Sequence, residues 1–294
     1  ETNLRKRDIH LTDTAVWNLH RVVYFAPDST GRQKIRAASG IKEAARIFLE
    51  GKDISREWIF SEIQQGEYLF DLSDLDDKQE EVKKLTDKIS DMLAHFKPDN
   101  EKFYRQLFPD FEKELADCEV MLTVGVPAPY DAMVIEQNGS KIIVFDMGRF
   151  LSYKDPQGFA QQMMTHETAH AMLHKKWQLK ETASYQEQLR FLCFDEGFAH
   201  LLACGKEIAS FDASMWIQEH YEPALAQLHQ ALTCEDESQQ EEWLYRAQTG
   251  RYWDKFAAIA GKLYLISHLN ELEKIYLEGP QKFMSPIFDT LERN

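Results

Sequence analysis

The chain has 294 residues, of which 44% are hydrophobic and 28% are charged, so it contains enough apolar side chains for one large domain or two. Its formal net charge of −15 argues against a nucleic acid or an anionic membrane surface as a partner. The sequence has no run of about 20 apolar residues, and we therefore expect no membrane span.

Residues 1–115 are predicted to form a helical N-terminal region, and residues 116–294 a second domain. The spacing of apolar residues in the first region is typical of helices at 42–49, 58–63, 78–96 and 101–114. An acidic run at 71–77 lacks the glycine and the final glutamate of a calcium-binding loop, and we interpret it as a solvated segment.

Residues 120–145 have the composition of a small antiparallel sheet. A β-rich run at 120–126 is followed by two short apolar runs, at 133–136 and 141–145. These two runs flank Asn138-Gly139, a dipeptide typical of a tight β-hairpin. We expect a hairpin here, which either belongs to an ordinary core or receives an extended peptide by strand addition.

The strongest signal is the H-E-x-x-H pattern at residues 166–170, on a helix predicted over 157–177. Residues i and i+4 share one face of a helix, so His166 and His170 can bind one Zn²⁺ together. Glu167 then lies close enough to take a proton from the attacking water. Chance would produce this pattern only about 0.03 times in such a chain, which favours a metal site.

A catalytic zinc needs a third protein ligand. The metzincin pattern is excluded because it requires Gly and His where this chain has Leu173 and Lys176. His174 continues the histidine spacing, but it lies two helical turns from His166. We therefore expect His174 to face solvent or to support a ligand rather than to bind the same zinc.

The third ligand is predicted on a second helix, over residues 191–203, which is apolar almost all round. Its strongly polar members are Asp195, Glu196 and His200, and a carboxylate in such surroundings must be paired or bind a metal. Glu196 shares its side of the helix with small residues and is the predicted ligand, with Asp195 as the alternative. Otherwise we expect Asp195 and His200 to orient the ligands.

The string D-E-G-F-A at 195–199 resembles the Asn-Glu-Gly-Phe-Ala element of zinc aminopeptidases of the gluzincin group. In that group the glutamate before the glycine, here Glu196, is the third zinc ligand. The 25 residues between His170 and Glu196 are more similar to the spacing in poorly characterised bacterial proteins predicted to be zinc-dependent proteases. The resemblance covers roughly residues 120–205, and it implies a zincin-like catalytic core and peptide hydrolysis.

Two features of the resemblance leave the substrate and one catalytic group open. The Gly-Ala-Met-Glu-Asn element that binds a free amine in those aminopeptidases has no counterpart, since Met133 is followed by Val134. Gluzincins stabilise the oxyanion with a Tyr or His further along the chain. The eligible residues here are His220, Tyr221, Tyr245, Tyr252 and Tyr264.

Tyr264 is our first choice as the oxyanion donor, and Tyr252 is the second. Tyr264 lies three residues after Gly261, where another helix can approach closely. The aromatic-rich segment 240–272, broken at Gly250, is expected to cover the site.

Together these features predict a mainly helical α+β protein with a zincin-like core, acting as a Zn²⁺-dependent peptidase on a peptide or protein substrate. Zinc is expected on His166, His170 and Glu196, with Glu167 as general base and Tyr264 as oxyanion donor. The alternatives are a non-catalytic zincin-fold regulatory or binding protein, and a hydrolase of non-peptide amides. Four cysteines without C-x-x-C spacing favour free thiols and a cytoplasmic location, with a removed leader left open.

Overall fold

The computed structural model describes residues 21–24, 36–37, 78–115, 119–123, 131–137 and 140–291. The chain divides into two compact units that interleave along the sequence: unit 1 comprises 1–97 and 110–167, and unit 2 comprises 98–109 and 168–294. The single boundary expected after residue 115 stays a prediction. The helices expected at 42–49 and 58–63, and the acidic run at 71–77, lie outside the described residues.

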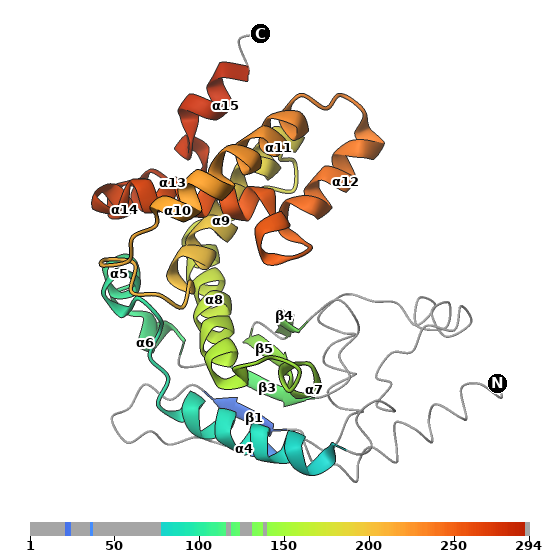
Figure 1. The fold of residues 1–294 in the computed structure, drawn as a ribbon, viewed down its shortest axis with the longest axis vertical. Helices are drawn as coiled ribbons and strands as arrows, with labels where there is room; N and C mark the ends of the chain where they lie inside the picture. Colours follow the sequence, from blue (N-terminus) through green and yellow to red (C-terminus); the bar gives the residue numbers. More distant parts are fainter. Residues whose placement is uncertain are drawn as a thin grey trace, which may run out of the picture. The chain divides into compact units, whose positions relative to one another are not determined.

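Unit 1 contains a five-stranded sheet with the order β2-β1-β3-β5-β4 (Figure 1). Strands β3 and β5 pair in parallel, and the other neighbouring strands pair antiparallel. The sheet is therefore mixed, and the expectation of a wholly antiparallel sheet is wrong for this pair. The reason is the strand order, in which β4 lies at the edge and β5 lies between β4 and β3. The hairpin reverses the chain after β4, so β5 runs in the same direction as β3. The strands are β1 (Arg21–Tyr24), β2 (Arg36–Ala37), β3 (Glu119–Thr123), β4 (Ala132–Gln137) and β5 (Ser140–Asp146).

The hairpin predicted around Asn138-Gly139 is confirmed by the pairing of β4 with β5. Gln137 lies opposite Ser140, so only two residues connect the strands, and these two lie outside the described residues. In β5, the side chains from Ile143 to Phe145 are buried. The sheet thus contributes apolar core to unit 1 at the strand that leads toward the motif helix.

The segments 78–96 and 101–114 both form helices, with narrower bounds than expected. Helix α4 (Gln79–Ala94) contacts β1 and the short helix α7 (Met147–Phe150). The segment 101–114, in which Phe108-Pro109-Asp110 indicates a turn, forms two helices, α5 (Glu101–Leu107) in unit 2 and α6 (Phe111–Glu114) in unit 1.

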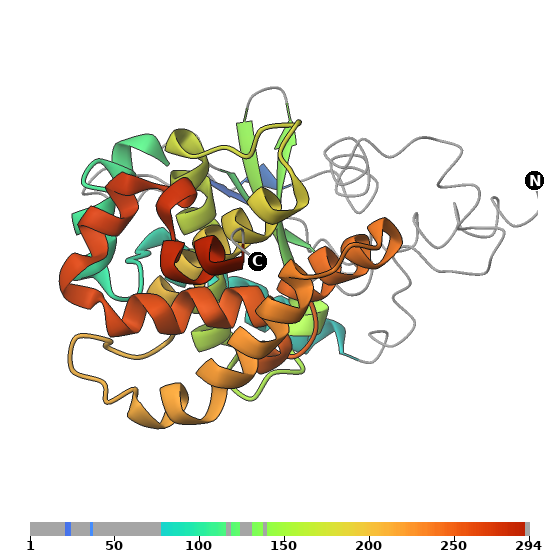
Figure 2. The ribbon, with the colours of Figure 1, turned by 90° about the horizontal axis from the view of Figure 1, so that it is seen from above.

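Unit 2 is helical throughout its described residues, and α13 is its central member. Helix α13 contacts α9, α11 and α12, as the two ribbon views show (Figures 1 and 2). The expected break at Gly250 is confirmed, since this glycine has a φ of 102° and follows the end of α12. The elements after α5 are α8 (Pro156–Lys176, its C-terminal part), α9 (Tyr185–Leu202), α10 (Ser214–Trp216), η3 (Ile217–Tyr221), α11 (Glu222–Leu232), α12 (Glu237–Gln248), η4 (Tyr252–Asp254), α13 (Phe256–Ser267), η5 (Leu269–Glu271), α14 (Leu272–Glu278), η6 (Pro280–Lys282) and α15 (Ser285–Leu291).

Helices α9 and α13 approach each other to backbone contact at Gly197 and Gly261. A Cβ atom on Gly261 would lie 1.9 Å from the carbonyl oxygen of Cys193, and one on Gly197 would lie 2.8 Å from the carbonyl carbon of Gly261. No side chain fits at either place, so the close packing expected at Gly261 is confirmed. The next residue, Lys262, is thereby held beside α9.

The mainly helical character expected from the sequence is confirmed. Within the described ranges, no helix is long and apolar enough to cross a membrane. Cys193, Cys204 and Cys234 are free cysteines, which agrees with the expectation of free thiols.

Candidate metal centre

Helix α8 carries the H-E-x-x-H residues, as predicted. It begins at Pro156, and the side chain of Asp155 accepts a hydrogen bond of 3.0 Å from the backbone N–H of Gly158. His166 is 8% exposed, and Glu167 is half-buried. The unit boundary falls inside α8, but the position of His166 relative to His170 is set by this one helix, on which they lie one turn apart.

Helix α9 supplies the second set of polar residues. It begins with a capping box, in which the Ser184 hydroxyl accepts from the backbone of Glu187 and the Glu187 carboxylate accepts from the backbone of Ser184. From its middle project Asp195 and Glu196, whose side chains are 8% and 14% exposed. A carboxylate so far from water needs a partner of opposite charge or strong donors.

Three donor atoms, one each from His166, His170 and Glu196, lie within 4.8 Å of one another. Two imidazole nitrogens and one carboxylate oxygen form a donor set that is common in catalytic zinc sites. His170 Nε2 is 3.7 Å from Glu196 Oε1, close to the separation of about 3.3 Å between ligand atoms with bonds near 2.0 Å around a tetrahedral ion. The three residues therefore fit a zinc ion.

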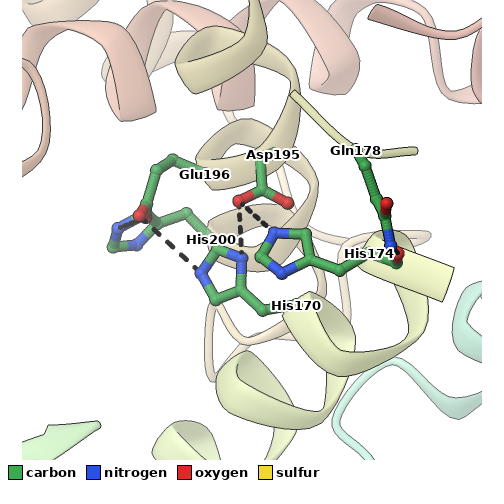
Figure 3. Close-up of polar contacts among 6 residues, drawn as sticks. All are labelled: His170, His174, Gln178, Asp195, Glu196 and His200. Atoms are coloured by element: carbon green, nitrogen blue, oxygen red, sulfur yellow. Dashed lines mark hydrogen bonds and ion pairs between the residues drawn. The ribbon is translucent and has the colours of Figure 1, made fainter. Parts of the chain in front are cut away.

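Asp195 contacts two histidines of α8 through a single oxygen (Figure 3). Its Oδ2 atom is 3.0 Å from His170 Nδ1 and 2.9 Å from His174 Nε2. If Nδ1 carries the imidazole proton, His170 has the lone pair of Nε2 on the side of Glu196. A carboxylate in this position fixes the tautomer and the ring orientation of a ligating histidine.

His170, His174 and Asp195 form a second group that meets the same 4.8 Å criterion. Its contacts of 3.0 and 2.9 Å are hydrogen-bond lengths, shorter than the separation of about 3.3 Å between ligands of a tetrahedral ion. The geometry thus favours Asp195 as a hydrogen-bond acceptor over Asp195 as a ligand. His174, with a side chain that is 41% exposed, contacts Asp195, and its ring lies 5.7 Å from that of His170, so its contacts are compatible with a supporting role.

The two neighbouring carboxylates have opposite electrostatic environments. Burial acts to raise the pKa of Asp195, but the charges and hydrogen bonds of His170 and His174 hold it well below its ordinary value. Burial raises the pKa of Glu196 above its ordinary value, against the opposing charge of His170. A cation beside Glu196 would favour its ionised form, so this carboxylate is suited to an ion.

His200 lies one turn beyond Glu196 on α9, and its Nε2 atom is 3.5 Å from Glu196 Oε2. The distance is compatible with the expectation that His200 orients Glu196, and that role stays a prediction. Burial, with the charges of Lys255 and Lys262, holds the pKa of His200 well below its ordinary value. His200 is therefore neutral at pH 7, and one ring nitrogen can donate to Glu196 without a net charge in the site.

The two preferred tyrosines have different surroundings. Tyr264, the first choice, packs against His268 and Phe283, with ring centroids 4.3 and 5.3 Å apart. The ring of Tyr252, the second choice, lies edge-on to His200 at 5.4 Å. These contacts link Tyr252 with the carboxylate end of the site, and they favour it over Tyr264 as the oxyanion donor.

The remaining eligible residues have other contacts. His220 stacks on Trp253 with centroids 3.8 Å apart, and Tyr245 is 57% exposed. Burial, with contributions from Tyr264 among others, raises the pKa of Tyr221 to about 12.

Sequence reasoning missed Lys262, a fully buried lysine whose Nζ atom is 2.5 Å from Tyr252 Oη. A signal was present, because Lys262 is the only charged residue in the otherwise apolar segment 256–267. Charge in such a helix is typical of a functional site or a specific buried pair.

Comparison with known proteins identifies no relative: no family model, no curated protein and no solved structure matches the chain. The assignment of the site therefore depends on the arrangement of the residues of this chain.

Proposed function

We propose that the chain is a zinc-dependent peptidase with a zincin-like core. The observation that carries the proposal is the grouping of donor atoms from His166, His170 and Glu196 within 4.8 Å, although Glu196 comes from a separate helix. The H-E-x-x-H pattern adds Glu167, a residue that a purely structural zinc site does not need. This glutamate is what favours an enzyme over a non-catalytic protein of the same fold.

The proposed mechanism divides metal binding, proton transfer and oxyanion stabilisation among different residues. His166, His170 and Glu196 would hold a zinc ion, which would supply Lewis-acid activation of water and of the substrate carbonyl. The Glu167 carboxylate accepts a proton from the attacking water and passes it to the leaving amine. Asp195 keeps the proton of His170 on Nδ1, and the Tyr252 hydroxyl donates to the developing oxyanion.

The peptide substrate is proposed from the position of strand β4. Strand β4 lies at the edge of the described sheet in unit 1, and the edge of a sheet is a place where an extended peptide can add. A reducing, cytoplasmic compartment is a separate proposal, and the three free cysteines of unit 2 support it.

The experiment is a comparison of wild type, Glu167→Gln and Glu181→Gln on a peptide library. Glu181 is an exposed glutamate, and its substitution controls for the loss of one negative charge. We expect Glu167→Gln to retain zinc and to lose several orders of magnitude in kcat, because the proton acceptor is gone. Near-normal turnover by Glu167→Gln would contradict the mechanism, and zinc binding without cleavage by wild type would favour a non-catalytic protein or a non-peptide amide as substrate.

A further inference from the structure

Lys262 is buried without a carboxylate partner. It lies on α13 with 0% exposure, and its Nζ atom is within ion-pair distance of no acidic side chain in the part of the chain that the structure describes. An unpaired ammonium in a protein interior lowers stability, whereas a methionine of similar volume would fill the same space at no such cost. Packing alone therefore does not explain a lysine at this position.

Three aromatic rings and one hydroxyl surround the ammonium. The Nζ atom lies 4.2 Å from the ring centroid of Trp216, 5.0 Å from that of Tyr252 and 5.6 Å from that of Trp253. Its hydrogen-bond acceptor is Tyr252 Oη, at 2.5 Å. Aromatic faces stabilise a cation without accepting its protons strongly, so the hydroxyl is the one directional contact of this group.

The direction of this hydrogen bond decides what the Tyr252 hydroxyl can do. An ammonium has donors and no acceptor, so Tyr252 Oη must accept from Lys262, and its own proton must point elsewhere. Tyr252 is 40% exposed, and its ring lies against His200, which is 3.5 Å from Glu196. Accepting a bond from a cation also makes a hydroxyl a stronger donor.

We propose, on the basis of the proposed function, that Lys262 is a positioning residue that turns the Tyr252 hydroxyl proton away from the protein interior and toward the anionic group formed on the substrate. The donor and acceptor of this hydrogen bond would exchange roles if Lys262 lost its proton. The neutral amine can then accept from Tyr252, which withdraws the hydroxyl proton from the substrate.

The pKa of Lys262 agrees with such a reversal in the working range of an enzyme. Burial lowers this pKa to about 8, against a smaller opposing effect of Cys204. The titratable groups that face Lys262 are Tyr252, Cys204 and His200. The positive charge of Lys262 lowers the pKa of His200. Burial raises the pKa of Tyr252 and lowers the pKa of His200, so neither of these two groups supplies a negative charge at pH 7.

The first arm of the test does not require turnover. Protein carrying ¹³C at tyrosine Cζ is titrated from about pH 6 to 9.5, and the Tyr252 resonance is identified by its absence in Tyr252→Phe. We expect this resonance to shift near pH 8 in the wild type, where Lys262 loses its proton. The shift should persist in Lys255→Met, a neighbouring lysine that acts on His200 through charge.

Lys262→Met removes the donor, and the transition near pH 8 should disappear. If the methionine variant does not fold, Lys262→Gln has the same expected result, since its amide does not titrate in this range. A Tyr252 transition retained in either folded variant, or absent from the wild type, would overturn the proposal.

The second arm uses turnover of a cleaved peptide. We expect kcat to fall roughly 10-fold in Lys262→Met and roughly 10²–10³-fold in Tyr252→Phe. The double variant should be no slower than Tyr252→Phe, because the lysine acts through the tyrosine. Independent, multiplying effects would overturn the positioning role. An absence of any peptide cleavage would count against the proposed function and leave the result of the titration to stand by itself.

Discussion

Asp195 and Glu196 are sequence neighbours with different roles in the site. Consecutive residues of a helix point about 100° apart, so the two carboxylates face different groups. Asp195 lies between His170 and His174, at hydrogen-bond distance from both. Glu196 lies near the opposite nitrogen of His170, at 3.7 Å, and near His200, at 3.5 Å. One oxygen of Asp195 is thus contacted by two histidines, and the Glu196 carboxylate is placed for a cation.

Asp195→Asn tests the orienting role. The amide keeps the size of the side chain but loses the negative charge that holds the His170 Nδ1–H. We expect zinc affinity to fall 10–100-fold, with the fold retained, because partners of this kind typically contribute that much. Competition with a chromogenic chelator measures the change.

Asp91→Asn, an exposed aspartate on α4, is the matched control for loss of one negative charge, and its affinity should equal that of the wild type. If Asp195→Asn abolished zinc binding altogether, Asp195 would instead be a ligand, as the alternative held.

At the scale of the elements, the backbone contact between α9 and α13 positions both halves of the site. Glu196 precedes Gly197 on α9, and Lys262 follows Gly261 on α13, so the two glycines that touch are adjacent to two functional side chains. Glycine in a helix interior is otherwise unfavourable by about 1 kcal/mol relative to alanine. Its use here is explained by the close approach of the helices.

Gly261→Ala should therefore destabilise the protein, although helix propensity predicts the opposite sign. The added methyl group would lie 1.9 Å from the carbonyl oxygen of Cys193, and the helices must separate to admit it. We expect the free energy of unfolding to fall by about 1–3 kcal/mol in urea denaturation. Ser267→Ala, at an exposed position of the same helix, should change it by less than about 0.5 kcal/mol. A Gly261→Ala variant as stable as the wild type would show that this contact is looser than described.

The helices that carry the site could be predicted because the residue pattern that indicates each of them lies within one short segment of the sequence. The H-E-x-x-H spacing and the apolar run around Glu196 indicate faces of single helices, and α8 and α9 form where expected. The parallel pairing of β3 with β5 could not be predicted, because strand order depends on contacts between distant segments. The preference between Tyr252 and Tyr264 also depends on contacts between distant segments, and the expected role of Tyr264 stays a prediction. The short helix after Gly250 brings the Tyr252 ring beside His200, and the sequence alone does not show this contact.

At the scale of the whole molecule, the buried lysine should make stability depend on pH. The folded-state pKa of Lys262 is about 8, below the ordinary value of 10.5. Between these two values the unfolded chain binds more protons than the folded protein, so this group makes stability rise with pH over that window. Below pH 8 the full destabilisation applies, and it amounts to about 3 kcal/mol.

Lys262→Met should remove this dependence. We expect the variant to be more stable than the wild type at pH 7, by about 1–3 kcal/mol, and the difference to shrink as pH rises from 8 toward 10.5. Urea denaturation at several pH values measures it, with Lys255→Met as the control for loss of one positive charge. A methionine variant that is less stable than the wild type at pH 7 would mean that the aromatic rings and Tyr252 compensate the buried charge.

The central claim is that His166, His170 and Glu196 bind one zinc ion, and elemental analysis of purified protein tests it most directly. We expect about one zinc per chain in the wild type and in His229→Ala, an exposed histidine of α11 that serves as the control. His170→Ala and Glu196→Gln each remove one ligand and should lose most of the metal while retaining the fold. Equal zinc in the wild type, His170→Ala and Glu196→Gln would contradict the account.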